Sequence, residues 1–183
     1  MASSGDLAGA RRVLEGALAE HPGNAALANS AGNMAMKAGD SEGAETFFAR
    51  AAELSPASVE YATNRAIALA ALERHRDALA ALAPLEAEGS QDPRYCSVRA
   101  NSARGVGDLA DAERWYDRSL ALAPAGAKAA HGRARVALER GTKDAVTRFE
   151  RALSLNQSDP EAWLRHEIWT KRTANAYRKP VDQ

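Results

Sequence analysis

The sequence predicts an all-α solenoid, an array of stacked helix pairs. Two observations support this fold class. The dipeptide Gly-Asp recurs at Gly5, Gly39 and Gly107, at intervals of 34 and 68 residues, and apolar residues at helical spacing follow each copy. A fixed period of this length is typical of a repeat architecture, in which each unit is one small supersecondary element.

Each repeat is predicted to contain two helices joined by a tight turn. Glycine tolerates the left-handed backbone that ends the first helix, and the Asp, Ser or Thr that follows can accept hydrogen bonds from the first N–H groups of the second helix. Prolines at Pro22, Pro56 and Pro124 follow the second helices and block their continuation. Because one such pair cannot bury its apolar faces alone, neighbouring pairs must stack.

The second helices carry the large apolar side chains that are predicted to hold the repeats together. Phe47 and Phe48 lie in one second helix, and Trp115 and Tyr116 lie in another, at the spacing of a helical core face. We therefore assign these four residues to the core between repeats and not to a base-stacking surface.

The repeats resemble the tetratricopeptide repeat, a unit of about 34 residues with small residues at fixed positions. The small-residue position of the first helix holds Gly32, Ala66, Ala100 and Ala134. The alanine position of the second helix holds Ala10, Ala44, Ala78, Ala112 and Ala145. The resemblance implies antiparallel helix-turn-helix repeats wound into a right-handed superhelix.

The resemblance covers nearly the whole chain and divides it into one continuous repeat domain. The predicted parts of residues 1–183 are a half repeat at 1–24, full repeats at 25–58, 59–92, 93–126 and 127–159, and a capping helix with a basic tail at 160–183.

The repeat at 59–92 is predicted to be the least regular one. It has Glu73 and Arg74 where other repeats have Gly-Asp, and Pro84 falls inside its expected second helix. Proline removes a helical hydrogen bond and clashes with the preceding turn, so it should kink or shorten this helix.

Composition argues against several classes of function. The chain has 24 basic and 24 acidic residues, so no bulk charge attracts nucleic acid or an anionic membrane. It has no apolar run of about 18–20 residues, and its start lacks the layout of a secretory signal. Cys96 is the single cysteine, which excludes an internal disulfide and favours a reducing cytoplasm. The Ala- and Arg-rich composition indicates a bacterial source.

Signatures of a metal site or of catalysis are missing from the sequence. The four histidines lie in different units without metal-ligand spacing, at His21, His75, His131 and His166. The sequence contains no glycine-rich phosphate loop and no GxSxG motif, and Cys96 lacks a Cys-His nucleophile signature. We therefore expect no metal, no cofactor and no catalytic activity.

The resemblance implies a concave groove, lined by the first helices, that receives a peptide or protein segment. Mapping the family's inward positions onto this sequence gives the groove candidates Asn29, Asn33, Lys37, Asn64, Arg94, Asn101, Arg104, Lys128, His131 and Arg135. The asparagine amides can donate and accept hydrogen bonds. The basic residues, toward the C-terminal half, would suit an acidic side chain or a terminal carboxylate. The predicted function is a non-catalytic interaction module or scaffold.

Two alternatives stay open. Each groove candidate can be a solvated surface residue, because exposed Asn and Arg are common. The family's carboxylate clamp is not reproduced, since Asn29 stands where that clamp has lysine. The chain can also be an accessory repeat domain of a larger bacterial enzyme of the sulfotransferase, glycosyltransferase or hydroxylase type. A catalytic domain directly downstream would favour this second alternative.

Overall fold

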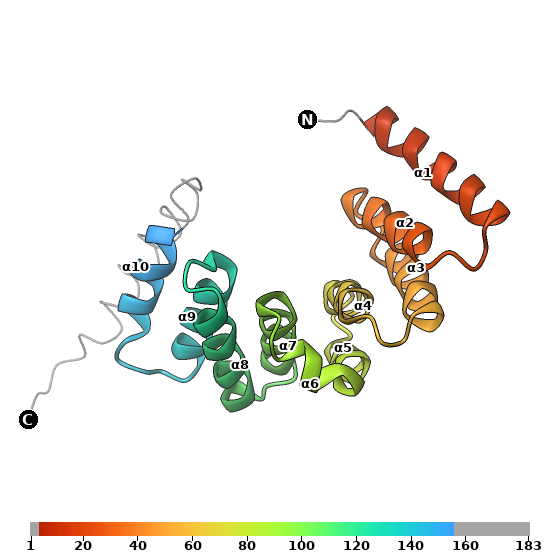
Figure 1. The fold of residues 1–183 in the computed structure, drawn as a ribbon. Helices are drawn as coiled ribbons and strands as arrows, with labels where there is room; N and C mark the ends of the chain where they lie inside the picture. Colours follow the sequence, from red (N-terminus) through yellow and green to blue (C-terminus); the bar gives the residue numbers. More distant parts are fainter. Residues whose placement is uncertain (1–3, 156–183) are drawn as a thin grey trace, which may run out of the picture.

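The computed structural model describes residues 4–155, which fold into helices joined by short turns, so the predicted all-α class is confirmed. The elements are α1 (Ser4–Glu20), α2 (Ala25–Lys37), α3 (Ser41–Leu54), α4 (Val59–Ala71), α5 (His75–Leu82), a 3₁₀ turn (Ala83–Leu85), α6 (Glu86–Gly89), α7 (Pro93–Gly105), α8 (Leu109–Leu122), α9 (Ala127–Glu139) and α10 (Ala145–Leu155). Figure 1 shows them stacked in chain order along an arc. The predicted capping helix and basic tail at 160–183 lie outside the described residues.

The Gly-Asp phrase marks the turn between the two helices of a repeat, as predicted. Asp40 caps α3 by accepting a hydrogen bond from the Gly43 N–H at 2.8 Å, and Asp108 caps α8 by accepting one from the Asp111 N–H at 3.0 Å. The first copy of the phrase differs, because Gly5 lies inside α1, which begins at Ser4. No described helix precedes Gly5, so no left-handed turn is needed there.

The left-handed residue of the turn is present in every described repeat, including the one that lacks glycine. Gly39, Gly107 and Gly141 have φ values of 80°, 86° and 67°, and Glu73 takes φ 58° at the corresponding place. The stacking geometry therefore imposes this conformation on a glutamate that does not favour it.

Replacing Glu73 with glycine should raise the free energy of unfolding by about 0.5–1 kcal/mol. The gain is the relief of left-handed strain on a side-chain-bearing residue, less the larger entropy that glycine has in the unfolded chain. The converse change, Gly107→Ala, should cost about 1–2 kcal/mol. Urea unfolding of both variants measures the two effects, and a destabilised Glu73→Gly protein would contradict this reasoning.

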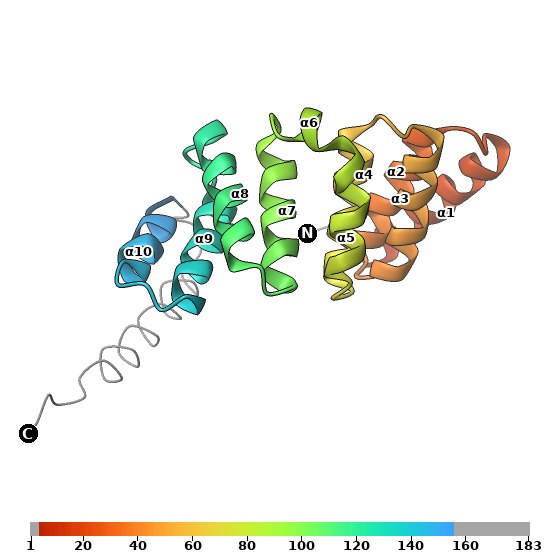
Figure 2. The same ribbon diagram turned by 90° about the horizontal axis from the view of Figure 1, so that it is seen from below.

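The second helix of the irregular repeat is shortened at Pro84, as predicted. The α-helix α5 ends at Leu82, and the chain continues through the 3₁₀ turn into the short α6; Figure 2 shows α6 between α5 and α7. Tyr95 of α7 fills the place of the missing helical turns, and its hydroxyl donates a hydrogen bond to the Leu82 carbonyl at 2.9 Å. A carbonyl near the end of α5 is thereby satisfied by a neighbouring repeat.

The aromatic residues of the second helices lie in the core, as predicted. Phe48, Trp115 and Tyr116 are 1%, 6% and 3% exposed, and Phe47 packs against the apolar clusters of the N-terminal repeats. Small residues from the first helices complete the core, so the repeats approach one another closely.

A second period of 34 residues links neighbouring repeats through ion pairs. Arginines at the same place in three first helices each pair with a carboxylate of the preceding repeat. The pairs are Arg65 with Glu45 at 3.0 Å, Arg99 with Glu86 at 3.0 Å, and Arg133 with Asp117. These contacts help to fix the order and register in which the repeats stack.

Candidate functional site: the inner face

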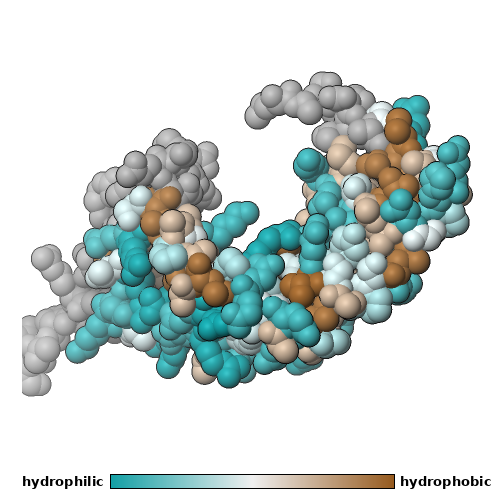
Figure 3. All heavy atoms as spheres, in the orientation of Figure 1, coloured by the Kyte–Doolittle hydropathy of each residue, from teal (hydrophilic) through white to brown (hydrophobic). Residues whose placement is uncertain are grey.

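The first helices α2, α4, α7 and α9 form a continuous row, which we call the inner face. Figure 1 shows α2 and α4 on the hollow side of the arc, with α3 and α5 behind them. Side-chain hydrogen bonds join α2 to α4, α4 to α7, and α7 to α9. Figure 3 shows the hollow of the arc, where hydrophobic residues gather in separate patches between hydrophilic ones.

Four polar side chains form a hydrogen-bonded chain across α2, α4 and α7, which we call the amide ladder. Asn29 donates to a Glu60 carboxylate oxygen at 3.3 Å and accepts from the Asn64 amide at 2.7 Å. The Asn64 carbonyl oxygen in turn accepts from the Arg94 guanidinium at 2.6 Å. The ladder therefore ties three consecutive repeats together along the inner face.

The ladder changes the interpretation of two predicted groove residues. Asn29 and Asn64 are only 8% and 3% exposed, so they do not present free amides to solvent. Small residues at the helix contacts bring the first helices close, and buried amides must then find hydrogen-bond partners within the chain. Their effect on the inner face is to hold Arg94, which is exposed, in one orientation.

A second polar cluster joins α7 to α9 in the C-terminal half of the inner face. The Arg104 guanidinium donates to Glu139 at 2.9 Å and to the Asn101 carbonyl oxygen at 3.4 Å. Part of the basic charge predicted for this half of the groove is therefore balanced by a carboxylate of the chain itself.

The remaining predicted groove residues are accessible. Asn33, Lys37, Lys128 and Arg135 are exposed, and within residues 4–155 they make no hydrogen bond or ion pair. His131 is also exposed, and its ring packs edge-on against Phe149 with centroids 5.7 Å apart. These side chains can contact a partner without first breaking an internal polar contact.

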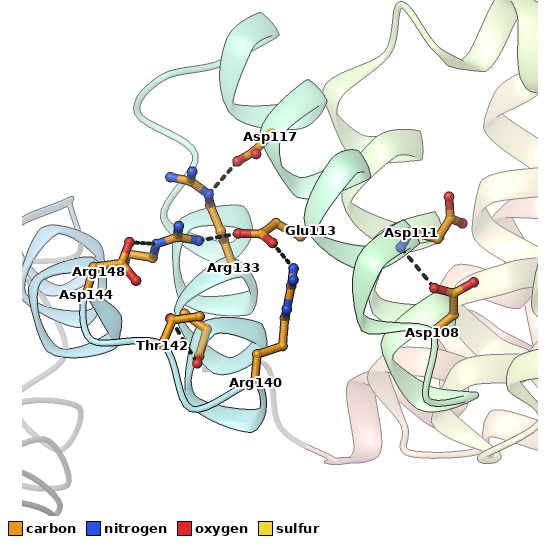
Figure 4. Close-up of polar contacts among 10 residues, drawn as sticks. Asp108, Asp111, Glu113, Asp117, Arg133, Arg140, Thr142, Asp144 and Arg148 are labelled. Atoms are coloured by element: carbon orange, nitrogen blue, oxygen red, sulfur yellow. Dashed lines mark hydrogen bonds and ion pairs between the residues drawn. The ribbon is translucent and has the colours of Figure 1, made fainter.

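An ion-pair network holds α10 and the turn before it against α8, away from the inner-face cluster (Figure 4). Glu113 accepts hydrogen bonds from Arg148, at 2.7 Å, and from Arg140. Arg148 also donates to Asp144 at 2.7 Å. The hydrogen bond from Arg148 and the nearby arginine charges lower the pKa of the Glu113 carboxyl, against the opposing effect of its partial burial.

Residues that could serve metal binding or nucleophilic chemistry do not gather in one place. Among residues 4–155, no group of three or more His, Cys, Asp and Glu could hold a metal ion. Cys96 is fully buried, and burial raises the pKa of its thiol, which makes the thiolate harder to form. Of the predicted single histidines, His166 lies outside the described residues. None of the helices described is long and apolar enough to cross a membrane.

One rule of spacing would have found the contacts that we did not expect from the sequence. Three hydrogen-bonded pairs join residues 35 positions apart: Asn29 with Asn64, Arg104 with Glu139, and Glu113 with Arg148. In a solenoid with a period of 34, this separation brings equivalent parts of neighbouring repeats side by side. A search for polar pairs at this separation would have indicated which groove candidates are paired.

Comparison with known proteins agrees with the repeat geometry. The family model of the tetratricopeptide repeat matches residues 1–63. This chain is a tetratricopeptide-repeat protein. It is 31% identical over 158 residues to protein FlbA of Caulobacter vibrioides, a match that covers 86% of this chain and 26% of FlbA. The chain thus spans about a quarter of the length of the curated relatives it matches.

Solved structures show the same tetratricopeptide-repeat fold. TTC0263 of Thermus thermophilus superimposes with a TM-score of 0.75 at 19% identity, over 90% of each chain. The first repeat domain of Spaghetti (RPAP3), solved with an Hsp90 peptide, gives a TM-score of 0.60 at 21% identity and covers 64% of this chain and 94% of its own. At these identities the likeness establishes the fold alone.

Proposed function

We propose that this tetratricopeptide-repeat chain is a non-catalytic interaction module that binds an extended segment of a partner protein along its inner face. The observation that carries the proposal is a row of same-register side chains on neighbouring first helices. Asn33, Ile67, Asn101 and Arg135 recur every 34 residues on α2, α4, α7 and α9. Of these, Asn33 and Arg135 are exposed, and Ile67 and Asn101 are partly exposed.

The spacing of the row suits an extended ligand. Packed helices lie about 8–10 Å apart, and an extended chain advances about 3.3 Å per residue, so a bound segment would use about three residues per first helix. The amide ladder fixes the helices before binding, which lowers the ordering cost of many modest contacts. The accessible Lys128 and Arg135 favour an acidic group toward the C-terminal half.

The solved complex of the RPAP3 repeat domain with an Hsp90 peptide supports the proposal, because it contains a peptide on a related fold. The departure from the family's carboxylate clamp at Asn29 makes a different ligand more suitable here.

The test is a triple substitution along the row, Asn33→Ala, Asn101→Ala and Arg135→Ala. The wild-type chain is first used to isolate and identify its partner from a lysate of the native organism. The triple variant should bind that purified partner at least tenfold more weakly, because it loses three contacts at once.

A matched control removes three exposed side chains from second helices, by Glu53→Ala, Thr147→Ala and Arg151→Ala. This control should bind the partner as the wild type does, and circular dichroism should show all three proteins folded. Unchanged partner binding by the folded inner-face triple variant would reject the proposed groove.

A second candidate function is that of an accessory repeat domain in a larger bacterial enzyme of the sulfotransferase, glycosyltransferase or hydroxylase type. The match to only about a quarter of the curated relatives' length favours it. An immunoblot of the native organism decides, because a product much larger than 19.4 kDa would support this candidate. The cytoplasmic location and bacterial source remain predictions from composition.

A further inference from the structure

We propose a carboxylate-binding site on the inner face between α7 and α9, formed by Arg104, Arg135 and Asn101, in which Glu139 of the chain itself holds Arg104 in the free protein. The site would bind an acidic side chain or terminal carboxylate of the partner. This inference rests on the proposed function, because it assumes that a partner segment lies along the inner face.

The Arg104 guanidinium is fixed in place before any partner binds. Its side chain is 17% exposed, and its terminal nitrogens donate to Glu139 at 2.9 Å and Asn101 at 3.4 Å. Its Nε is buried and has no hydrogen-bond partner in the part of the chain that the structure describes. Only the planar end of the guanidinium therefore reaches the inner face, in an orientation suited to a carboxylate.

Arg135 approaches the same point from the neighbouring first helix. The ring of Tyr116 passes between α7 and α9 against Gly132, where an added Cβ would stand 2.3 Å from the ring carbon that bears the hydroxyl. Burial raises the pKa of the Tyr116 hydroxyl, and the charges of Arg104 and Arg135 oppose that rise. Both arginines thus lie close enough to one hydroxyl to act on a single anion.

Glu139 shows which ligand chemistry the site accepts. Its carboxylate already forms an ion pair with Arg104, and its side chain is 36% exposed, so it can move into solvent. Such a partly exposed pair is weak. Arg135 makes no ion pair within residues 4–155. An incoming carboxylate can therefore contact both arginines, whereas Glu139 contacts one.

The experiment uses Glu139→Gln in the full chain. The probe is a fluorescein-labelled hexaglutamate peptide, with hexaglutamine as its neutral analogue, and binding is measured by fluorescence anisotropy at several salt concentrations. Removing the competing carboxylate should raise hexaglutamate affinity about fivefold. Arg104→Gln and Arg135→Gln should each lower it about tenfold or more. Hexaglutamine binding should not change.

The matched control is Glu60→Gln, which removes the inner-face carboxylate of the amide ladder. It removes one negative charge from the inner face, as Glu139→Gln does, so it measures the effect of charge alone. Hexaglutamate affinity that is equal in Glu139→Gln and wild type, or raised no more than in Glu60→Gln, overturns the inference. Absence of hexaglutamate binding by every variant also overturns it, while the proposed function is decided separately by the partner-binding triple substitution.

Discussion

Replacing Trp115 with alanine should lower the free energy of unfolding by about 3–5 kcal/mol. The indole is 6% exposed and fills the space beside the shortened α5. It packs edge-on against Tyr95 with ring centroids 6.1 Å apart, and the Arg99 guanidinium lies 4.7 Å from its ring centre. Alanine would leave a cavity between two repeats and would remove the aromatic and cation–π contacts together.

Urea unfolding followed by circular dichroism measures the loss. Trp115→Phe is the matched control, because it keeps a ring at the contact with Tyr95 and should be much less destabilised. Since each repeat is stabilised largely by its neighbours, the alanine variant should also unfold less cooperatively, with the two halves of the array separating. A loss below about 1 kcal/mol would show that the neighbouring repeats collapse into the space, contrary to this account.

The Glu113→Gln substitution should lower the free energy of unfolding by about 1–3 kcal/mol at pH 7. Glu113 is 21% exposed and accepts from Arg148 and Arg140, so the change leaves two guanidinium groups without their anionic partner. Because the network holds α10, hydrogen exchange should speed up in α9 and α10 and stay unchanged in α2 and α3. Glu53→Gln on exposed α3 should stay within about 0.5 kcal/mol of the wild type.

The effect of Glu113→Gln should depend on pH in a defined direction. The Arg148 hydrogen bond lowers the pKa of Glu113 below its ordinary value of 4.5. The ion pair therefore contributes fully above about pH 4.5, and its contribution is lost as the pH falls through the lower pKa of the folded state. The difference between wild type and variant should shrink below that pH.

The neighbouring carboxyls do not reverse this trend in the difference. Asp144, whose pKa is lowered by a hydrogen bond from Thr142, and Asp117, whose pKa is raised by burial, are both present in each protein. Arg133 stays paired with Asp117 in both as well. A difference in stability that persists unchanged at pH 3 would contradict the assignment to Glu113.

The sequence predicted the helices because the signals that begin and end them are local. Asp40 and Asp108 cap α3 and α8 through N–H groups three residues away, and Pro84 ends α5 without any contribution from other repeats. The turn at Glu73 was less predictable. Its left-handed backbone follows from the packing of α4 and α5, and no local preference of glutamate indicates it.

The inner face was predicted as a location, but its chemistry required the tertiary structure. Asn29 and Asn33 lie one helical turn apart on α2 and look equivalent in the sequence. Asn29 is buried in the amide ladder and Asn33 is exposed. The same holds for Arg104 and Arg135, since only Arg104 has a carboxylate partner within residues 4–155.

The sequence by itself therefore determined the repeat period, the helix ends, the aromatic core and the row of first helices on which binding is proposed. These features depend on hydrophobic periodicity and on hydrogen bonds within a few residues. Only the tertiary structure decided which polar groups of that row are paired. Their partners lie 30 to 35 residues away, as for Arg94 with Asn64 and Arg104 with Glu139, and are brought close by the stacking of repeats.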